Sequence, residues 1–267
     1  MPRANRYFLP GHVWHITHRC HEREFLLKFA RDRTRYLRWL FEARKRHGLC
    51  VLNYVVTSNH IHLLVRDQGS GEIAQSMQLI AGRTAQQYNV RKARQGAFWQ
   101  DRYHATAIET NEHLHRCLVY IDLNMVRAGV VQHPSEWEHG GYRELQDPPA
   151  RYRIVDLDAV SALCGFPDLS RFQSEHRIWV DETLASRRDR QDDQWSQSIA
   201  VGSARYVETV KTALGISALH REVVPSDAGH TLREPQSAYT AHFAAKNTGL
   251  RAENTVPWNE SDETTNA

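Results

Sequence analysis

Two histidines separated by one residue are the first side chains in this sequence that could do chemistry. His60 and His62 lie in the run 55–65, whose second half is typical of a β-strand. Side chains of a strand alternate between its two faces, so both imidazoles are expected on one face, with Ile61 and Leu63 facing a core. Two neutral imidazoles at this spacing can begin a divalent metal site, although a chain with 16 histidines also produces such a pair by chance. The pair therefore needs a third ligand before it predicts a reaction.

A tyrosine and an asparagine later in the chain could complete such a site. Tyr120 and Asn124 are four residues apart in a segment with helical spacing, so they share one helix face. The amide oxygen of Asn124 is an acceptable ligand for Mg²⁺ or Mn²⁺, and the phenolic oxygen of Tyr120 could attack phosphorus. The alternative is that Tyr120 is a half-buried packing residue, the commoner role of a tyrosine in a helix. If this helix packs across the face of the two histidines, the four residues form a metal-activated phosphoryl-transfer site.

The elements that must position these residues follow the order β-α-β-β-α-β and then a helix. Apolar spacing predicts strands over 11–20, 49–56, 60–66 and 103–108, and helices over 32–47, 71–90 and 111–129. This is the order of the ferredoxin-like split βαβ fold, an α+β arrangement with an antiparallel sheet and helices on one face. Such a fold has many functions, so the order alone does not select one.

The sequence changes character after about residue 147. Pro148 and Pro149 indicate a domain boundary, and the segments 156–165 and 205–214 have a helical pattern. From about residue 225 onward the hydrophobic periodicity fades and polar residues dominate. We therefore predict three parts: a domain over 1–147, a C-terminal α-helical extension over 148–224 and a disordered tail over 225–267.

Charge is distributed unevenly between the two halves. Residues 1–145 contain 21 Lys and Arg against 13 Asp and Glu, a net charge of +8, and the remaining residues carry a net charge of −5. Most of the basic residues are arginines, whose planar guanidinium matches phosphate oxygens. A polyanion is therefore an expected partner of the first half, although a solvated charged surface would have the same composition.

Basic residues interleaved with aromatic residues suit phosphate contacts combined with base stacking. The alternative is that Phe98 and Trp99 are core residues, which we expect for one of the two. The candidate DNA-binding residues are Arg83, Arg91, Lys92, Arg94, Trp99, Arg102 and Tyr103.

Composition also restricts the class of protein. No stretch approaches the roughly 18 apolar residues of a membrane span, and the first residues lack an apolar signal core. The four cysteines are scattered without a CxxC pair, so we expect reduced thiols and no zinc cluster. We therefore expect a cytoplasmic protein with no membrane partner.

Three segments, in this order along the chain, resemble one known family. The run 58–65, SNHIHLLV, looks like the HUH motif of single-tyrosine transposases. The run 96–103, GAFWQDRY, resembles the Gly-x-x-Trp-x-x-Arg-Tyr segment of their REP-associated branch, and the run 119–129, VYIDLNMVRAG, resembles the tyrosine helix Tyr-Ile-x-x-Asn-Pro-Val-Arg-Ala-Gly. The resemblance covers roughly residues 5–145. The chain departs from the pattern at Thr57-Ser58, where Met-Pro is common, and at Met125, where Pro is common, so we expect its helix to run longer.

The resemblance implies a fold, a reaction and a role for each site residue. It implies the HUH nuclease fold, with His60, His62 and Asn124 as ligands of Mg²⁺ or Mn²⁺ and Tyr120 as the nucleophile. The protein would be a metal-dependent single-strand DNA transposase and endonuclease, forming a 5′-phosphotyrosine bond next to palindromic hairpin repeats. Its partner would be single-stranded DNA with hairpin repeats, and the protein would be a monomer or homodimer. Two alternatives stay open: a metal-dependent nuclease without a covalent step, and a ferredoxin-like nucleic-acid-binding module without catalysis.

Overall fold

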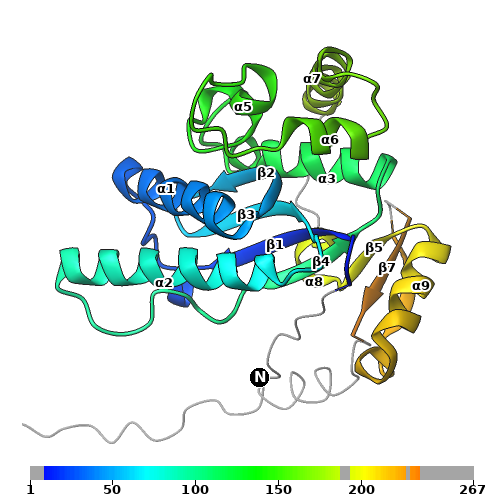
Figure 1. The fold of residues 1–267 in the computed structure, drawn as a ribbon, viewed down its shortest axis with the longest axis horizontal. Helices are drawn as coiled ribbons and strands as arrows, with labels where there is room; N and C mark the ends of the chain where they lie inside the picture. The colour runs from blue at the N-terminus through cyan, green and yellow to red at the C-terminus, as the bar shows by residue number, and fades with distance from the viewer. Residues whose placement is uncertain (1–8, 187–192, 227–228, 235–267) are drawn as a thin grey trace, which may run out of the picture. The chain divides into compact units, whose positions relative to one another are not determined.

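The computed structural model describes residues 9–186, 193–226 and 229–234 (Figure 1). Its centre is a sheet in which β1 (Val13–Arg19), β2 (Cys50–Val56), β3 (His60–Arg66) and β4 (His104–Ile108) are antiparallel neighbours in the order β2-β3-β1-β4. This is the strand order of a ferredoxin-like sheet, so the predicted α+β fold class is confirmed. No helix of the described ranges is both long and apolar enough to cross a membrane.

Two long helices cover one face of this sheet. α1 (Ala30–His47) ends at Gly48, which takes the left-handed conformation at φ 71°, and α2 (Glu72–Lys92) runs beside it (Figure 1). His18 of β1 is paired with Ile61 and therefore shares its face. The ring of His18 stacks on Trp99, which in turn donates a hydrogen bond to Ala81 of α2. The face with Ile61 is therefore the core beneath α1 and α2, as the alternation of β3 predicted.

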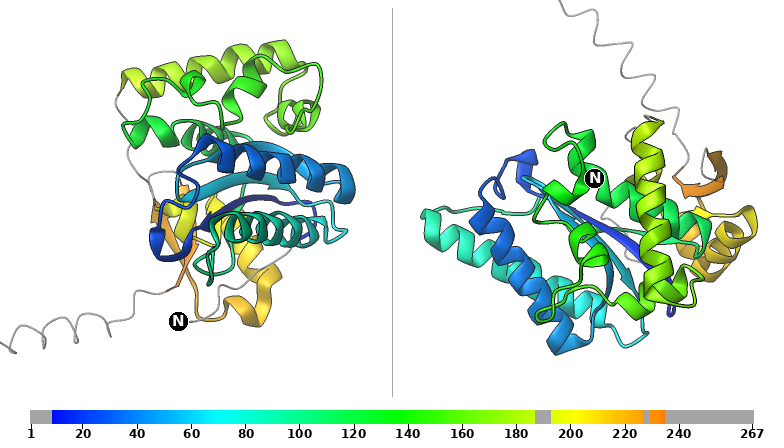
Figure 2. Two further views of the ribbon diagram at one scale, coloured as in Figure 1. Left: turned by 90° about the vertical axis from the view of Figure 1, so that its left-hand side faces the viewer. Right: turned by 90° about the horizontal axis from the view of Figure 1, so that it is seen from above.

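The opposite face carries the helix with the tyrosine. α3 (Glu112–Asp122) contacts β2 and β4, and the short α4 (Asn124–Arg127) follows after Leu123. The backbone thus stays helical to Arg127, as expected from Met125 in place of proline, but it forms two segments rather than one longer helix. α7 (Leu169–Ala185) packs against α3, and α6 (Leu157–Leu163) contacts α7 and β2 (Figure 2).

The C-terminal extension differs from the prediction because it also supplies strands. Besides α6, α7, α8 (Gln194–Gln197) and α9 (Ala204–Leu214), it contains β5 (Ala200–Gly202), β6 (Glu222–Ser226) and β7 (Gly229–Arg233). α5 (Tyr142–Gln146) lies before it, within the predicted domain. β5 pairs in parallel with β4, and the sheet continues in the order β5-β7-β6. These strands cover the free edge of β4, but three to five residues are too short to show a strand pattern in sequence.

Two predicted limits need correction. The predicted helical extension also contains strands, and β6 and β7 lie partly or wholly beyond residue 225, where the predicted tail begins. Residues up to Glu234 form one compact unit, so the predicted limit at residue 147 does not separate two bodies. The predicted disorder of residues 235–267 lies outside the described residues.

Candidate functional site

One cavity brings together the four residues that the sequence selected for chemistry. It has a volume of about 510 Å³ and lies between β1, β3, α3, α4 and α8. His60 and His62 reach it from β3, Tyr120 from α3 and Asn124 from α4. Its lining consists of these four residues together with Arg19, Arg23, Asn59, Ala128, Arg127 and Ser196.

The two histidines stand side by side as the strand alternation predicted. Their ring centroids are 5.0 Å apart and the ring planes are nearly perpendicular, at 81°. Burial, together with the charges of Arg19 and Arg127, lowers the pKa of His60 to about 4. Burial, with the neighbouring histidines His15 and His60 and the same arginines, lowers the pKa of His62 well below its usual value. Both imidazoles are therefore neutral at pH 7, which is the form that binds metal ions.

Tyr120 and Asn124 face His62 from the helical segment above it. The ring of Tyr120 lies 5.8 Å from that of His62 in an edge-on arrangement, at 83°. The Asn124 amide nitrogen, Nδ2, is 3.1 Å from Nε2 of His62. The four-residue spacing therefore aligns both side chains with the histidine face, across the break at Leu123.

These donors fit a divalent cation. Two neutral imidazoles with unprotonated nitrogens could bind it, and half a turn of the Asn124 amide about its last bond would present an oxygen. Within residues 9–186, 193–226 and 229–234, no three His, Cys, Asp or Glu side chains are grouped to hold a metal ion. The amide of Asn124, the residue that the sequence analysis selected, could serve as a third ligand beside His60 and His62. The set leaves positions open for water and phosphate oxygens.

Three arginines of the cavity were not selected from the sequence. The guanidinium carbon of Arg127 lies 4.2 Å from the centre of the Tyr120 ring, and its Nη2 donates to the Tyr120 carbonyl oxygen at 2.6 Å. Arg19 ends β1, and Arg23 follows it in a turn with the left-handed backbone, φ 60°. Three guanidinium groups beside neutral histidines suit a phosphate anion. A signal for Arg127 existed, since it lies seven residues after Tyr120 and so on the same helix side.

His15 and Trp195 were also missed, and both support the site from behind. His15 of β1 is fully buried, stacks on His62 with ring centroids 5.0 Å apart, and places Nε2 2.8 Å from Nδ1 of His62. Its other nitrogen, Nδ1, lies 2.7 Å from the carbonyl oxygen of Trp195 on α8. The Trp195 ring lies 6.0 Å from that of Tyr120. A role for Trp195 had no signal in sequence, because it comes from the extension and acts through its backbone.

The predicted DNA-binding residues lie outside this cavity. Lys92 and Arg102 are exposed, and Arg94 bonds to the carbonyl oxygen of Ala97. Tyr103 is buried, and Trp99 is partly buried in the contacts with His18 and Ala81. Base stacking on Tyr103 is therefore dropped, since its ring faces are covered, and Trp99 is better explained as a packing residue.

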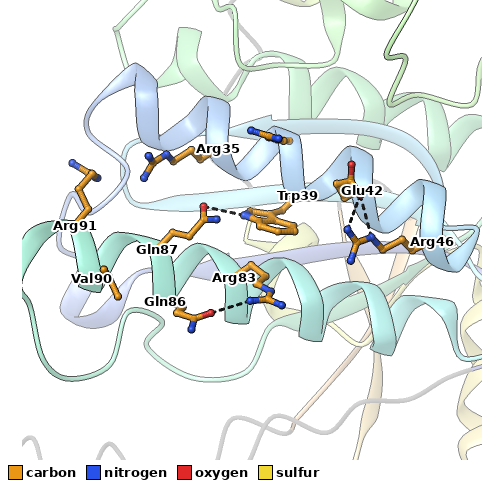
Figure 3. Close-up of a pocket in the computed structure, with 10 residues that line it drawn as sticks. Arg35, Trp39, Glu42, Arg46, Arg83, Gln86, Gln87, Val90 and Arg91 are labelled. Carbon is orange, nitrogen blue, oxygen red and sulfur yellow. Dashed lines mark hydrogen bonds and ion pairs between the residues drawn. The ribbon is translucent and has the colours of Figure 1, made fainter.

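Arg83 and Arg91 line a second cavity, of about 720 Å³, between α1 and α2 (Figure 3). In this groove Trp39 donates a hydrogen bond to Gln87, and Arg46 pairs with Glu42. Because α1 and α2 cover the face with Ile61, the groove and the histidine cavity lie on opposite sides of the sheet. Its charged lining, one glutamate against five arginines, is Arg35, Arg38, Glu42, Arg46, Arg83 and Arg91.

Parts of the chain are similar to known proteins. No curated protein matches the chain. Among solved structures, a REP-associated tyrosine transposase bound to a REP hairpin is similar at 19% identity and a TM-score of 0.47, over 60% of this chain and 96% of that one. A candidate transposase from Deinococcus radiodurans is similar at 15% identity and a TM-score of 0.32, over 42% of this chain and 89% of that one.

A family model gives the more specific result. The model of IS200-like transposases matches residues 10–124. The matched segment begins just before β1 and ends at Asn124, so it contains His60, His62 and Tyr120. Residues 10–124 are therefore similar to the IS200-like transposase family.

Proposed function

We propose that this protein is a metal-dependent transposase and endonuclease of single-stranded DNA that works through a 5′-phosphotyrosine intermediate. The observation that carries the proposal is the meeting of His60, His62, Tyr120 and Asn124 in one cavity lined by arginines. His60, His62 and Asn124 would hold Mg²⁺ or Mn²⁺. When bound there, the cation would polarise the scissile phosphate and stabilise charge on the leaving oxygen.

The protein's own residues carry the bond changes. The phenolic oxygen of Tyr120 attacks the phosphorus in line, forming a P–O bond while the bond from phosphorus to the 3′ oxygen breaks. The tyrosine gives up its proton and the 3′ oxygen leaves as a hydroxyl. Arg127, stacked on the Tyr120 ring, holds its orientation, and Arg19 and Arg23 bind the phosphate oxygens. Rejoining is the reverse attack by a 3′ hydroxyl, so it needs no other energy source.

The substrate form follows from the shape of the site and from the motif resemblance. An unpaired strand bends into a recessed site more easily than a stiff duplex. The hairpin beside it is the substrate form implied by the REP-associated motifs, and the arginine groove between α1 and α2 would bind backbone phosphates. Arg83 and Arg91 therefore keep their proposed role in DNA binding, with Arg38 as a further member.

Trapping of a covalent protein–DNA adduct tests the proposal directly. Full-length protein is mixed with single-stranded DNA carrying a hairpin and a 5′ or 3′ label, with Mn²⁺ or with chelator. The expected result is a denaturation-resistant adduct on the 5′ end and a free 3′ hydroxyl on the other fragment, in Mn²⁺ only. Cleavage without an adduct would support the plain nuclease instead, and binding without cleavage would support the non-catalytic module.

A further inference from the structure

We propose that two hydrogen-bond chains, each beginning at a backbone carbonyl, fix His60 and His62 in the tautomer with an unprotonated Nε2. The inference makes His15 and Asn59 positioning residues, and it rests on the proposed function because it concerns the two histidines that would bind the cation. The C-terminal extension would then help to orient His62, since one of the two carbonyls belongs to Trp195.

The chain behind His62 runs through His15. A carbonyl oxygen only accepts hydrogen bonds, so Nδ1 of His15, 2.7 Å from the Trp195 oxygen, carries the hydrogen. His15 is fully buried, which favours the neutral ring with a single N–H. Its Nε2 is then an acceptor, 2.8 Å from Nδ1 of His62, and this nitrogen must donate. The remaining nitrogen of His62, Nε2, therefore bears the lone pair.

The chain behind His60 runs through Asn59. The Asn59 amide nitrogen donates to the carbonyl oxygen of Arg23 at 3.1 Å, which directs the amide oxygen toward His60. This oxygen is 2.7 Å from Nδ1 of His60. The hydroxyl of Thr57 donates its hydrogen to the His60 carbonyl, so its oxygen also accepts from Nδ1, at 3.0 Å. Two acceptors thus hold the hydrogen on Nδ1 and leave Nε2 of His60 with the lone pair.

This tautomer, with hydrogen on Nδ1, differs from the one that predominates for a histidine in water, which carries its hydrogen on Nε2. A metal ion binds only an unprotonated ring nitrogen, and ligating histidines are commonly oriented through the other nitrogen. Nε2 of His62 is also the atom that lies 3.1 Å from the Asn124 amide. The two chains therefore prepare both lone pairs before a cation arrives.

His104 offers a matched control. It lies on β4, next to β1 in the sheet, and its Nε2 bonds to the carbonyl oxygen of Ser198 at 2.9 Å. It thus shares with His15 the bond from a strand histidine to a carbonyl of the extension. The difference is that His15 also forms a hydrogen bond to His62 through its second ring nitrogen. Replacing His104 tests the loss of such a bond without a change in the chain behind His62.

The test is NMR of full-length protein labelled with ¹⁵N-histidine, in the absence of metal, combined with Mn²⁺ titration by calorimetry. Long-range proton–nitrogen correlations report which ring nitrogen is protonated. In the unsubstituted protein, His60 and His62 should each show a protonated Nδ1 and an unprotonated Nε2. His15→Gln should keep this pattern, because its amide can donate to Trp195 and accept from His62. His15→Phe should move His62 toward the Nε2–H tautomer, leave His60 unchanged and weaken Mn²⁺ binding about 10- to 100-fold.

His104→Phe should leave both the His62 signals and the Mn²⁺ affinity unchanged. A protonated Nε2 on His60 or His62 in the unsubstituted protein would overturn the inference, as would an unchanged His62 in folded His15→Phe. If His15→Phe does not fold, the tautomers of His60 and His62 in the unsubstituted protein and in His15→Gln still test the inference. If the expected tautomers are seen but Mn²⁺ does not bind, the cation site of the proposed function fails and the tautomer assignment stands.

Discussion

His176 of α7 and Asp122 of α3 form a fully buried pair, with Nε2 and Oδ2 2.8 Å apart. Asn53 of β2 donates to the other oxygen of the same carboxyl group at 2.9 Å. Asp122 lies between Tyr120 and Asn124 in sequence, so this pair connects the extension to the segment that carries both residues. The stability of the extension and the geometry of the site are therefore linked.

Removal of one member of this pair should destabilise the fold strongly. In Asp122→Ala, the buried groups of His176 and Asn53 lose their partner, and each unsatisfied group costs about 1–3 kcal/mol of the free energy of unfolding. Urea denaturation followed by circular dichroism measures the change. Arg171→Ala, an exposed substitution on the same helix as His176, should change it by less than about 0.5 kcal/mol. Equal stability of the two variants would contradict the proposed link.

Tyr120→Phe should abolish cleavage and the covalent adduct while DNA binding is kept. Only one hydroxyl is lost, and the ring contacts with His62 and Arg127 can remain. Gel assays of adduct and of hairpin binding measure the two properties separately. Tyr88→Phe is the control, because Tyr88 lies on α2 against Phe98 and should be dispensable for chemistry. Full cleavage by Tyr120→Phe would eliminate the tyrosine mechanism.

His60→Ala and His62→Ala should each remove cleavage with little change in DNA affinity, since affinity depends on the basic surfaces. Asn124→Ala should reduce cleavage less, because a water molecule can replace one neutral oxygen ligand of Mg²⁺. Activity of the unsubstituted protein should vanish in chelator and return with Mg²⁺ or Mn²⁺. Cleavage at the full rate in excess chelator would rule out the cation site.

Much of the site could be predicted from sequence because its residues obey local periodicities. The alternation of β3 placed His60 and His62 together, and the four-residue spacing placed Tyr120 with Asn124. The parts that were missed depend on contacts between distant segments. Trp195 contributes a backbone oxygen, which no side-chain pattern can indicate, and β5 has only three residues. Tyr103 looked suitable for stacking by its type and neighbours, but its burial is decided by tertiary packing.

Acid should destabilise the protein below about pH 6.5. Burial lowers the pKa of His15 to about 3 and that of His60 to about 4, and it also lowers the pKa of His104. Below pH 6.5 these histidines bind protons in the unfolded chain but stay neutral in the folded chain. Their contribution to stability is therefore present above that pH and is lost as the pH falls toward 4. Each such group contributes about 1.4 kcal/mol per pH unit at most.

Urea denaturation at pH 7.5, 6.5 and 5.5 measures this dependence. The free energy of unfolding should fall slightly between the first two values and more steeply between the second and the third. His15→Gln should have a flatter profile, because one of the buried histidines is gone. A profile that rises from pH 7.5 to 5.5 would contradict the prediction.

The arginine groove between α1 and α2 should determine salt-dependent affinity without affecting chemistry. Arg38 and Arg83 line this groove on the side of the sheet away from Tyr120, and each phosphate contact that is lost removes about 0.7–0.9 from the slope of log affinity against log salt. The double variant Arg38→Ala/Arg83→Ala should therefore bind hairpin DNA more weakly and with a slope smaller by about 1.4–1.8. At saturating DNA its cleavage rate should equal that of the unsubstituted protein.

The matched control is Arg171→Ala/Arg205→Ala, which removes two exposed arginines of the acidic extension and should leave the slope unchanged. Binding measured by fluorescence anisotropy between 50 and about 300 mM salt distinguishes the two variants. Identical slopes for both double variants would move the DNA-binding surface elsewhere on the protein.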